Sequence, residues 1–482
     1  MGDLVKPEWL LRHSMCPLQA ADSDTLQLLV TDQTESTDIH ELEYATRRRF
    51  ELYRTSSDVV ERAIERFRRL TTQGESTSLA SEQDESAADT RGLASQPPVI
   101  RYVNLLVREA AALQASDIHL EGARDGLTAR FRIDGVLGDG PIPPPGMHGA
   151  IVSRCKLLAG LDIAEKRRPQ DGRIRMRLEE SELDLRVSTV PTLHGESIVI
   201  RLLDRGSRPV ALAALGMPHT ALEELSSIIA RPQGLVLVTG PTGSGKTTTL
   251  YAALAHRNNG SEKLITVEDP IEYQIPGVTQ VPVHHGTGVS FASALRAILR
   301  QDPDVLLIGE LRDSETAAVA IQAAMTGHLV LATLHTNDAI GAFPRLLDLG
   351  VPPYLLVDTV TAVVAQRLVR RVCEECGLHL RPSSGDVRWM EAVGGAAIAA
   401  VERRGVGCIA CRGTGFRGRV GVFESVVPNE ELRRAVATGV GHDGLVKCLE
   451  QSATHVSLVA DGLAKVAAGV TTIAEVRRVA FG

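Results

Sequence analysis

The sequence predicts an α/β protein whose central domain is built on a parallel sheet. Four short apolar segments, LVLVTG, LITVED, VLLIGE and LVLATLH, lie between Leu235 and His335 and are typical of buried parallel strands. Helical segments alternate with these strands along the chain. Each strand ends in glycine or a polar residue, so polar groups gather at the carboxyl ends of the strands, where doubly wound sheets bind ligands.

Composition divides the chain of 482 residues into several regions. The predicted bounds are 1–70 for a small N-terminal α/β domain, 71–98 for a linker, 99–205 for an α+β domain, 206–371 for the parallel-sheet domain, 372–425 for a cysteine module and 426–482 for a helical C-terminal region. The segment 71–98 is rich in Ser, Thr, Asp, Glu and Gln and has almost nothing to bury. This composition favours a flexible linker over a long surface loop.

The first two domains show local patterns of helix and strand. In the N-terminal domain, Asp38–Phe50 is a predicted helix, FELYRT is a short strand, and Ser57–Leu70 has apolar residues at helical spacing. The domain at 99–205 is predicted to begin with an amphipathic helix, Val99–Gln114. Four segments there alternate as strands do, namely Asp117–Leu120, Leu127–Ile133, Arg173–Leu178 and Leu183–Val190. Asp-Gly pairs at 134–135 and 171–172 are predicted turns.

Bulk composition limits the classes of function. The net charge of −7 and the pI of about 6.1 argue against a dedicated nucleic-acid binder, which usually carries a basic surplus. No apolar run reaches about 18 residues, so no transmembrane helix is predicted. The N-terminus lacks the apolar core of a secretory signal, so a cytosolic location is expected. Work on a membrane would then require a partner.

The segment GPTGSGKT at 240–247 fits the phosphate-binding pattern G-x-x-x-x-G-K-[ST] without a mismatch. It follows a buried strand and opens a helix, which is the context that the pattern requires. Its glycines allow backbone amides to converge on phosphate, and the helix N-terminus adds partial positive charge. Lys246 is expected to reach the β- and γ-phosphates and Thr247 to bind Mg²⁺. The predicted nucleotide contacts are Gly240, Pro241, Thr242, Gly243, Ser244, Gly245, Lys246, Thr247 and Thr248.

Two further strand ends carry carboxylates. Glu310 ends VLLIGE and is predicted to orient the attacking water, although Gly309 stands where an aspartate is expected. Glu268 and Asp269 end LITVED and are predicted to help hold Mg²⁺, Glu268 also as a catalytic group. The alternatives are a surface glutamate at 310 and a turn role for 268–269 before Pro270.

Histidines flank the last of the four strands. His335 lies at its end, where it is predicted to sense the γ-phosphate, and His328 lies at its start. A lone histidine is more often structural, and that alternative stays open for both.

Four of the seven cysteines form two C-x-x-C pairs, Cys373/Cys376 and Cys408/Cys411. Each pair can supply one edge of a tetrahedral site, and four thiolates leave no open position, which predicts a structural zinc. Four ordinary thiols are the alternative. Cys16, Cys155 and Cys448 have no partner pattern and are expected to be buried small residues.

Four blocks together resemble the secretion ATPase superfamily that drives type II secretion and type IV pilus assembly. They are GPTGSGKTTTLYA, ITVEDPIEY, LRQDPDVLLIGELRDSETA and TGHLVLATLHTNDA, which the family calls Walker A, Asp box, Walker B and His box. Upstream, ASDIHLE, FRIDGVL, AEKRRPQDGRIR and RVSTVPTLHGESIVIRLLDR extend the resemblance over 98–482. It implies a PAS-like domain joined to a RecA-like P-loop ATPase domain, in a homo-hexameric ring. RLLDR and LLDLGVPPYLL favour the type II secretion branch.

The resemblance also implies that arginines from the preceding domain approach the nucleotide. The candidates are Arg130, Arg132, Arg173 and Arg186. Basic residues that merely line a solvated sheet face are the alternative, and 166–168 could instead be a nucleic-acid patch.

As a function, the resemblance implies an ATP-hydrolysing motor for type II secretion and pseudopilus assembly, with ATP, Mg²⁺ and Zn²⁺ as cofactors. The implied partners are the cytoplasmic domain of an inner-membrane anchor protein, bound by 1–70, and an inner-membrane platform protein. No nucleic acid is expected, and the location is cytoplasmic with attachment to the inner membrane through partners. The alternatives are a pilus-assembly or DNA-uptake ATPase, a zinc-bearing nucleic-acid-binding protein, and a scaffold that binds ATP without hydrolysis.

Overall fold

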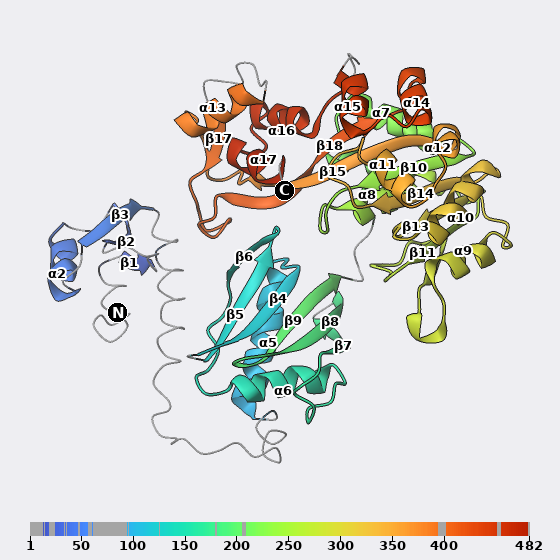
Figure 1. Cartoon of the computed structure of the whole chain (residues 1–482). Helices are drawn as coiled ribbons and strands as arrows, with labels where there is room; N and C mark the ends of the chain where they lie inside the picture. The colour runs from blue at the N-terminus through green and yellow to red at the C-terminus, as the bar shows by residue number, and fades with distance from the viewer. Residues whose placement is uncertain are drawn as a thin grey trace. The chain divides into compact units, whose positions relative to one another are not determined.

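The chain forms two compact units, residues 1–85 and 86–482 (Figure 1). The computed structural model describes residues 13, 15–18, 25–32, 34, 36–46, 49–55, 60, 94, 96–124, 126–178, 181–204, 209–393, 402–450 and 455–480. Most of the predicted linker, 71–98, lies outside the described residues.

The described part of the smaller unit contains a three-stranded sheet and the helix α2. Its elements are β1 (Met15–Leu18), β2 (Thr25–Val30), α2 (Ser36–Thr46) and β3 (Arg49–Arg54). The sheet order is β1-β2-β3, with β2 and β3 parallel. Leu28, Leu42 and Phe50 form its core. The sequence predicts this helix over Asp38–Phe50, but the observed helix α2 ends at Thr46, because Phe50 already lies in β3. The helix predicted at Ser57–Leu70 lies outside the described residues except at Val60, which is helical.

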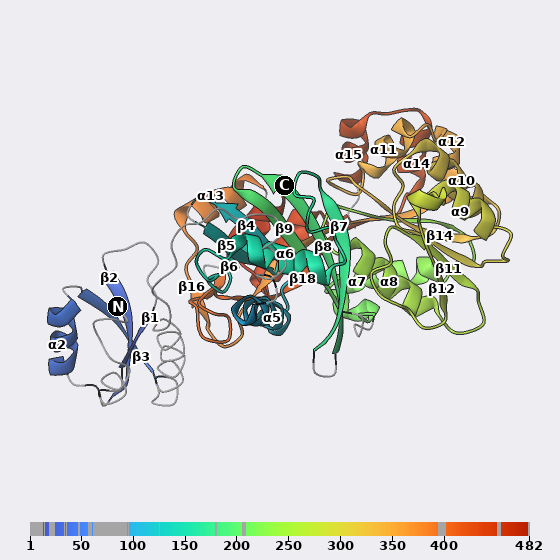
Figure 2. The same ribbon diagram turned by 90° about the horizontal axis from the view of Figure 1, so that it is seen from below.

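The larger unit begins with a six-stranded antiparallel sheet of order β6-β5-β4-β9-β8-β7. Its elements are α5 (Pro97–Ala112), β4 (Asp117–Ala123), β5 (Gly126–Ile133), β6 (Val136–Asp139), α6 (His148–Leu158), β7 (Gln170–Leu178), β8 (Ser181–Thr192) and β9 (Gly195–Asp204). β7 and β8 run side by side as a long hairpin (Figure 2). Both helices contribute to the sheet's core, in which Leu106, Ile151 and Ile200 are fully buried.

The two Asp-Gly predictions in this domain have different outcomes. Asp134 and Gly135 have φ of 50° and 84° and join β5 to β6, so that turn is confirmed. The turn at 171–172 is wrong, because both residues lie within β7 and pair with β8. A glycine is still needed there: a Cβ on Gly172 would lie 2.6 Å from the carbonyl oxygen of Ala159.

The second part of this unit is a seven-stranded sheet of order β12-β11-β13-β14-β10-β15-β18. Its strands are β10 (Gly234–Thr239), β11 (Leu264–Glu268), β12 (Val278–Pro282), β13 (Val305–Ile308), β14 (Leu329–Leu334), β15 (Val360–Val372) and β18 (Phe416–Val426). The four predicted strands are β10, β11, β13 and β14, and they are parallel as expected. Only the pairing of β18 with β15 is antiparallel.

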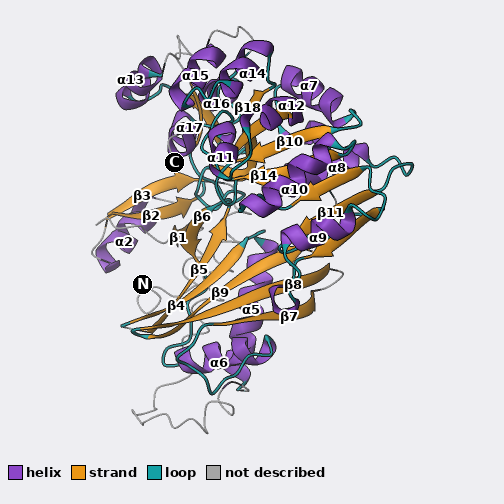
Figure 3. Cartoon of the chain, turned by 45° about the vertical axis from the view of Figure 1, so that its right-hand side comes forward, coloured by secondary structure: helices purple, strands orange, loops and turns teal. Residues whose placement is uncertain are grey.

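Helices cover both faces of this sheet (Figure 3). The covering elements are η1 (Leu212–Leu215), α7 (His219–Ile229), α8 (Lys246–Arg257), α9 (Phe291–Ile298), α10 (Ser314–Met325), α11 (Ala342–Asp348), α12 (Pro353–Thr359), α14 (Glu430–Ala437) and α15 (His442–Glu450). The short 3-10 turn η2 (His285–Thr287) lies in the connection between β12 and α9. Along β10, Leu235 and Leu237 belong to one core and Val236 and Val238 to the other. A strand buried on both faces explains the continuous apolar run of LVLVT.

The four cysteines of the two C-x-x-C pairs lie between β15 and β18. The remaining elements are β16 (Gly377–Leu380), α13 (Ser384–Ala392), β17 (Glu402–Gly405), α16 (Leu458–Ala467) and α17 (Ile473–Ala480). The predicted cysteine module, 372–425, includes β18, which the structure places in the central sheet. Within the described residues, no helix combines the length and apolar character needed to cross a membrane.

Candidate functional site

The glycine-rich loop joins the end of β10 at Thr239 to the start of α8 at Lys246. Gly240, Gly243 and Gly245 have φ of 149°, 79° and 88°, in the region that favours glycine. A Cβ on Gly240 would lie 2.5 Å from the carbonyl oxygen of Gln366, on the neighbouring strand β15. The loop is therefore shaped by its glycines and backed by β15.

The other predicted nucleotide contacts lie around this loop. Pro241 and Thr242 are exposed, and Thr247 and Thr248 lie half-buried in the first turn of α8. Exposed backbone at a helix N-terminus is a suitable place for an anion. Ser244 is buried, and its Oγ has no hydrogen-bond partner among the described residues.

Lys246 folds back over the loop. Its Nζ donates to the carbonyl oxygens of Gly240, at 2.7 Å, and Pro241, at 3.0 Å. Burial lowers the pKa of Lys246 to about 8. The negative charge of Glu310 partly opposes this shift, and the positive charge of Arg367 adds to it. An ammonium held only by two carbonyls can exchange them for phosphate oxygens at little cost.

Glu310 and His335 lie beside this lysine. The Glu310 carboxylate, whose side chain is 12% exposed, lies 3.7 Å from His335 Nε2 and 2.6 Å from Arg312 Nε. Burial and then Lys246 lower the pKa of His335, which favours the neutral ring, although Glu310 opposes them. The predicted residues Lys246, Glu310 and His335 thus form one cluster at the carboxyl ends of β13, β14 and β10. His328 lies at the other end of β14, where its Nδ1 is 3.0 Å from the carbonyl oxygen of Ala323.

Close packing explains the glycine that precedes Glu310. A Cβ on Gly309 would lie 3.3 Å from the carbonyl oxygen of Val267 and 3.4 Å from the Cα of Glu268. An aspartate at 309 would fit only if the neighbouring backbone of β11 shifted by a few tenths of an ångström. Only Glu310 therefore brings a carboxylate from this strand to the loop.

Glu268 is in a different environment from Asp269. Glu268 is 3% exposed, and its carboxylate accepts hydrogen bonds from Thr266, Gln280 and the hydroxyl of Tyr251. These donors leave it little capacity for a metal or a water, so the surroundings favour a positioning role over the predicted catalytic one. The neighbouring Asp269 is exposed.

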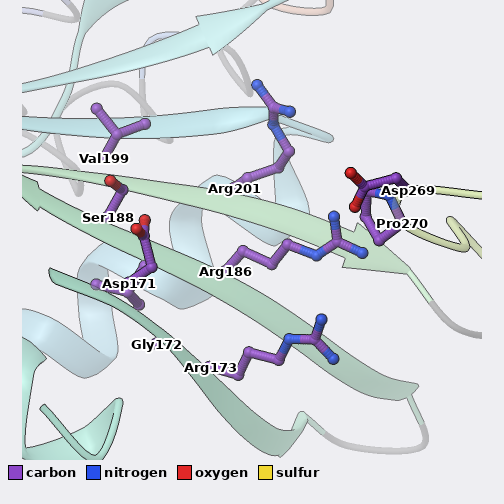
Figure 4. A pocket seen from close by; sticks show the side chains of 10 residues that line it. Asp171, Gly172, Arg173, Arg186, Ser188, Val199, Arg201, Asp269 and Pro270 are labelled. Carbon is purple, nitrogen blue, oxygen red and sulfur yellow. The ribbon is translucent and has the colours of Figure 1, made fainter. Parts of the chain in front are cut away.

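A row of arginines crosses the six-stranded sheet. Arg173 pairs with Arg186 across β7 and β8, and Arg186 pairs with Arg201 across β8 and β9. All three side chains line a pocket of about 560 Å³, and Arg186 points across it toward Asp269 and Pro270 (Figure 4). Arg186 Nη2 donates to the carbonyl oxygen of Ile271 at 3.2 Å.

Like charges directly opposite each other destabilise a sheet. The row gives the pocket a positive lining that suits an anionic ligand, although Arg201 Nε also donates to Asp117 at 3.0 Å. Burial lowers the pKa of Arg186, while Glu272 raises it. Arg201 was missed in the sequence, although the alternation of IRLLDR could have placed it on the same face as its neighbours in the row.

The other two candidate arginines are engaged elsewhere. Arg130 Nε donates to Glu121 at 3.1 Å, and Arg132 Nη1 donates to the carbonyl oxygen of Gly135 at 3.0 Å. Arg132 also lies 3.8 Å from the buried Asp117, to which Arg201 donates. Neither Arg130 nor Arg132 lines the pocket that faces Asp269.

The four predicted zinc ligands converge. Their sulfur atoms all lie within 4.8 Å of one another, with Sγ–Sγ distances of 3.8 Å for Cys373–Cys408, 3.7 Å for Cys376–Cys411 and 3.7 Å for Cys408–Cys411. Zinc–sulfur bonds of about 2.3 Å in a tetrahedron place sulfurs about 3.8 Å apart. The amides of Cys408 and Gly415 lie 3.1 and 3.2 Å from the Cys411 sulfur, where they stabilise a thiolate. The cluster is therefore compatible with zinc.

The remaining cysteines differ in burial. Cys16 and Cys155 are buried and Cys448 is half-buried, so the expectation of small buried residues is confirmed for the first two. Burial raises the pKa of Cys16 to about 11 and that of Cys155 to about 12, which makes both poor nucleophiles.

Sequence comparisons match almost the whole chain to known families. The family described as type II/IV secretion system protein matches residues 93–478, and the MshEN domain matches residues 1–74. The chain is 49% identical over 382 residues to type II secretion system protein HxcR of Pseudomonas aeruginosa, covering 79% of this chain and 77% of that protein. It is 48% identical over 394 residues to type II secretion system protein E of Xanthomonas campestris pv. campestris, covering 81% and 68%.

Solved structures show the same fold. The crystal structure of the pilus retraction motor PilT with bound ADP has a TM-score of 0.52 and 28% identity, covering 77% of this chain and 95% of that one. The Legionella pneumophila ATPase DotB has a TM-score of 0.57 and 20% identity, covering 79% and 95%. With these RecA-like neighbours, the predicted fold class is confirmed.

Proposed function

The chain belongs to the type II/IV secretion system protein family of ATPases, and from that premise we propose that it is the ATP-hydrolysing motor of a type II protein secretion system. The observation that supports hydrolysis is the cluster of Lys246, Glu310 and His335 beside the glycine-rich loop. The relatives at 46–49% identity are type II secretion proteins, which favours secretion over pilus assembly.

In this proposal the loop amides of 240–247 and Lys246 hold the β- and γ-phosphates. Lys246 exchanges the two carbonyl oxygens that it now contacts for phosphate oxygens, which neutralise it more fully. The Thr247 hydroxyl and Asp269 would hold Mg²⁺, which would supply positive charge to neutralise the phosphates. Glu310 accepts a hydrogen bond from the attacking water and orients it toward the γ-phosphate, and His335 donates to that phosphate.

The arginine row completes the charge balance. Arg173, Arg186 and Arg201 stabilise the negative charge that develops on the transferred phosphoryl group, to which an arginine can contribute about 10³–10⁵ in rate. Arg130 and Arg132 are assigned a structural role in the sheet, because they donate to Glu121 and to the carbonyl oxygen of Gly135.

The four cysteines would hold Zn²⁺ as a structural ion. Four thiolates in a closed tetrahedron leave no position for substrate, so the ion would order the segment between β15 and β18. The predicted regions then have distinct roles: 1–70 docks the partner, 99–205 supplies arginines, and 206–371 binds nucleotide.

The proposed assembly is a homo-hexamer in the cytoplasm, attached to the inner membrane through an anchor protein and a platform protein. Hydrolysis in the ring would drive pseudopilus assembly. The net charge of −7 gives no support to a nucleic-acid partner.

Steady-state ATPase assays of the full chain with MgATP test the hydrolytic function. Glu310→Gln keeps the size and hydrogen-bonding capacity of the side chain and removes its charge, so ATP turnover should fall by about 10²–10⁴-fold while MgATP binding persists. Glu223→Gln is the matched control, because Glu223 is an exposed glutamate on α7. Equal turnover in the Glu310 variant and the control would refute the assigned role.

A further inference from the structure

Strand β15 continues past the end of β10 and runs behind the glycine-rich loop. Thr239, the last residue of β10, pairs with Ala365, so Gln366 and Arg367 lie beyond it. Successive side chains of a strand point to opposite faces. Gln366 faces α8, where its Oε1 accepts a hydrogen bond of 2.6 Å from Thr249. Arg367 is thereby directed to the other face.

Arg367 lies between the loop and the segment after β14. It is 4% exposed, and its Nη1 would lie 3.2 Å from a Cβ on Gly240. Its Nη2 donates to the carbonyl oxygen of Asn337 at 2.7 Å, in the same segment that carries His335. Among the residues that the structure describes, Arg367 Nε has no hydrogen-bond partner. The guanidinium therefore donates to the segment after β14, lies close beside Gly240 of the loop and retains an unused donor.

Two carboxylates, those of Asp338 and Glu424, attract this guanidinium electrostatically. Burial lowers the pKa of Arg367, and Asp338 and Glu424 oppose that effect. Glu424 is 6% exposed and lies on β18, far from the loop in sequence. The charges of Asp338 and Glu424 therefore stabilise the ionised guanidinium of Arg367.

The same carboxylates contact the C-terminal helices. Asp338 Oδ2 lies 3.2 Å from Nε2 of His442, the first residue of α15. Glu424 Oε2 accepts a hydrogen bond of 3.4 Å from the amide of Leu458, the first residue of α16, and Oε1 lies 3.6 Å from His455 Nε2. Contacts thus run from Arg367 through the segment 337–339 to the start of both helices, because the amide of Ala339 donates to Glu424 Oε1 at 3.4 Å.

We propose that Arg367 is a positioning residue that couples the state of the phosphate-binding loop to the docking of α15 and α16. When an anion occupies the loop and draws Lys246 away from its carbonyls, the loop backbone that abuts Arg367 shifts, and the guanidinium redistributes its attraction between Asn337 and the two acids. The contacts at the start of α15 and α16 change accordingly. Such coupling is reciprocal, so loosening the helices must alter the loop. The inference rests on the proposed function only in taking this loop as the nucleotide site.

A double-mutant cycle tests the coupling. The variants are Glu424→Gln, Arg367→Met and the pair, with Arg367→Lys as the conservative form. The first measurement is hydrogen exchange of amides 240–247 in the nucleotide-free full chain, which needs no ATPase function. Glu424→Gln should accelerate this exchange about 5-fold in the wild-type background and by less than about 2-fold when Arg367 is Met. Arg367→Lys should restore part of the Glu424→Gln effect on exchange, because lysine keeps the positive charge but lacks the several N–H donors of the planar guanidinium.

The second measurement is the affinity for MgADP, determined by calorimetry. Glu424→Gln should weaken it about 5-fold with Arg367 present and leave it unchanged with Met at 367. Asp461→Asn is the matched control: Asp461 is another buried acid near β18, bonded to the amide of Phe423 and to Lys465, and it should not affect the loop.

The outcomes separate the coupling from the nucleotide function. The coupling would be overturned if Glu424→Gln had equal effects with Arg and with Met at position 367. It would also be overturned if Glu424→Gln did not change the hydrogen exchange of the loop. An Arg367→Met chain that fails to fold would leave Arg367→Lys to decide: the coupling then fails if lysine transmits the Glu424 effect as fully as arginine. A coupled loop that binds no MgADP would instead refute the proposed function and leave the coupling intact.

Discussion

The glycine-rich loop 240–247 and the tetracysteine cluster are both glycine-containing turns that bring polar atoms together beside β15. In the loop, Lys246 Nζ donates to the carbonyl oxygens of Gly240 and Pro241, and Glu310 lies nearby with part of its side chain exposed. In the cluster, four sulfurs enclose one small volume, and backbone amides already point at Cys411. The lysine of the loop can therefore exchange its hydrogen-bond partners, whereas the four sulfurs of the cluster are turned toward one another and leave no position for another ligand.

This difference separates a site for chemistry from a site for stability. Catalysis needs charges that gain better partners in the transition state than they have before it. A structural metal needs every ligand committed and no open position. Changes at the two places should therefore affect different measurements.

Zinc removal should have the largest effect, and its effect should be on structure. Structural zinc contributes about 10–16 kcal/mol to the folding of small zinc domains, so chelation or Cys411→Ser should disorder the segment 373–415. Hydrogen exchange of that segment should approach unfolded rates, and metal analysis should show the loss of zinc. Cys448→Ser is the control. If metal analysis of the untreated chain finds no zinc, the cluster is four thiols and the comparison fails.

Lys246→Ala should have the next largest effect, and its effect should be on chemistry. Losing one charged donor to the transferred phosphoryl group should lower ATP turnover by about 10²–10³-fold, with unchanged thermal unfolding. Lys263→Ala provides the control, since Lys263 is an exposed lysine at the edge of β11. Retained turnover in Lys246→Ala would mean that the loop does not hold the phosphates.

The ion pairs of Glu475 provide a second test of structural stability near the cysteine cluster. Although burial alone would raise the pKa of Glu475, hydrogen bonds from Arg478 and Arg370 lower it to about 2. Arg370 stacks on Phe416, with its guanidinium carbon 4.1 Å from the ring centroid, and so supports β15 just before Cys373. Glu475→Gln should lower the free energy of unfolding by about 1.5–3 kcal/mol at pH 7, with little change in turnover.

The pH dependence of this effect has a definite sign. Because the folded pKa of Glu475 is depressed, its contribution to stability is complete above its ordinary pKa of 4.5 and is lost as the pH falls toward 2. Denaturant unfolding of wild type and variant should therefore differ most above pH 5. A difference that grows as the pH falls below 4.5 would contradict the assigned ion pairs.

The smallest predicted effect is the pH dependence of nucleotide binding. The charged form of Lys246 binds phosphate, and its pKa in the free protein is about 8. Affinity for MgADP should therefore be constant below pH 7 and fall by up to about tenfold per pH unit above 8, with proton uptake on binding. Calorimetry in buffers of different ionisation enthalpy measures that uptake. Lys246→Arg, which does not titrate in this range, should abolish it.

The sequence by itself determined the features that are local in the chain. The loop 240–247, the four apolar strands and the two C-x-x-C pairs each occupy a few consecutive residues with a fixed chemical requirement, such as glycine where φ is positive. Their identity therefore follows from short patterns. The α/β class follows in the same way from strands that are apolar on both faces.

Tertiary structure decided the features that depend on register and on pairing between distant segments. The arginine row needs Arg186 opposite Arg173 and Arg201, and no local pattern states that pairing. The commitment of Glu268 to Tyr251 and the position of Arg367 behind the loop likewise come from side chains far apart in sequence. The place of β18 in the central sheet depends on hydrogen bonds to β15 across the cysteine segment. Burial and electrostatic environment are properties of such contacts, so the sequence could name reactive residues but could not say which of them were already engaged.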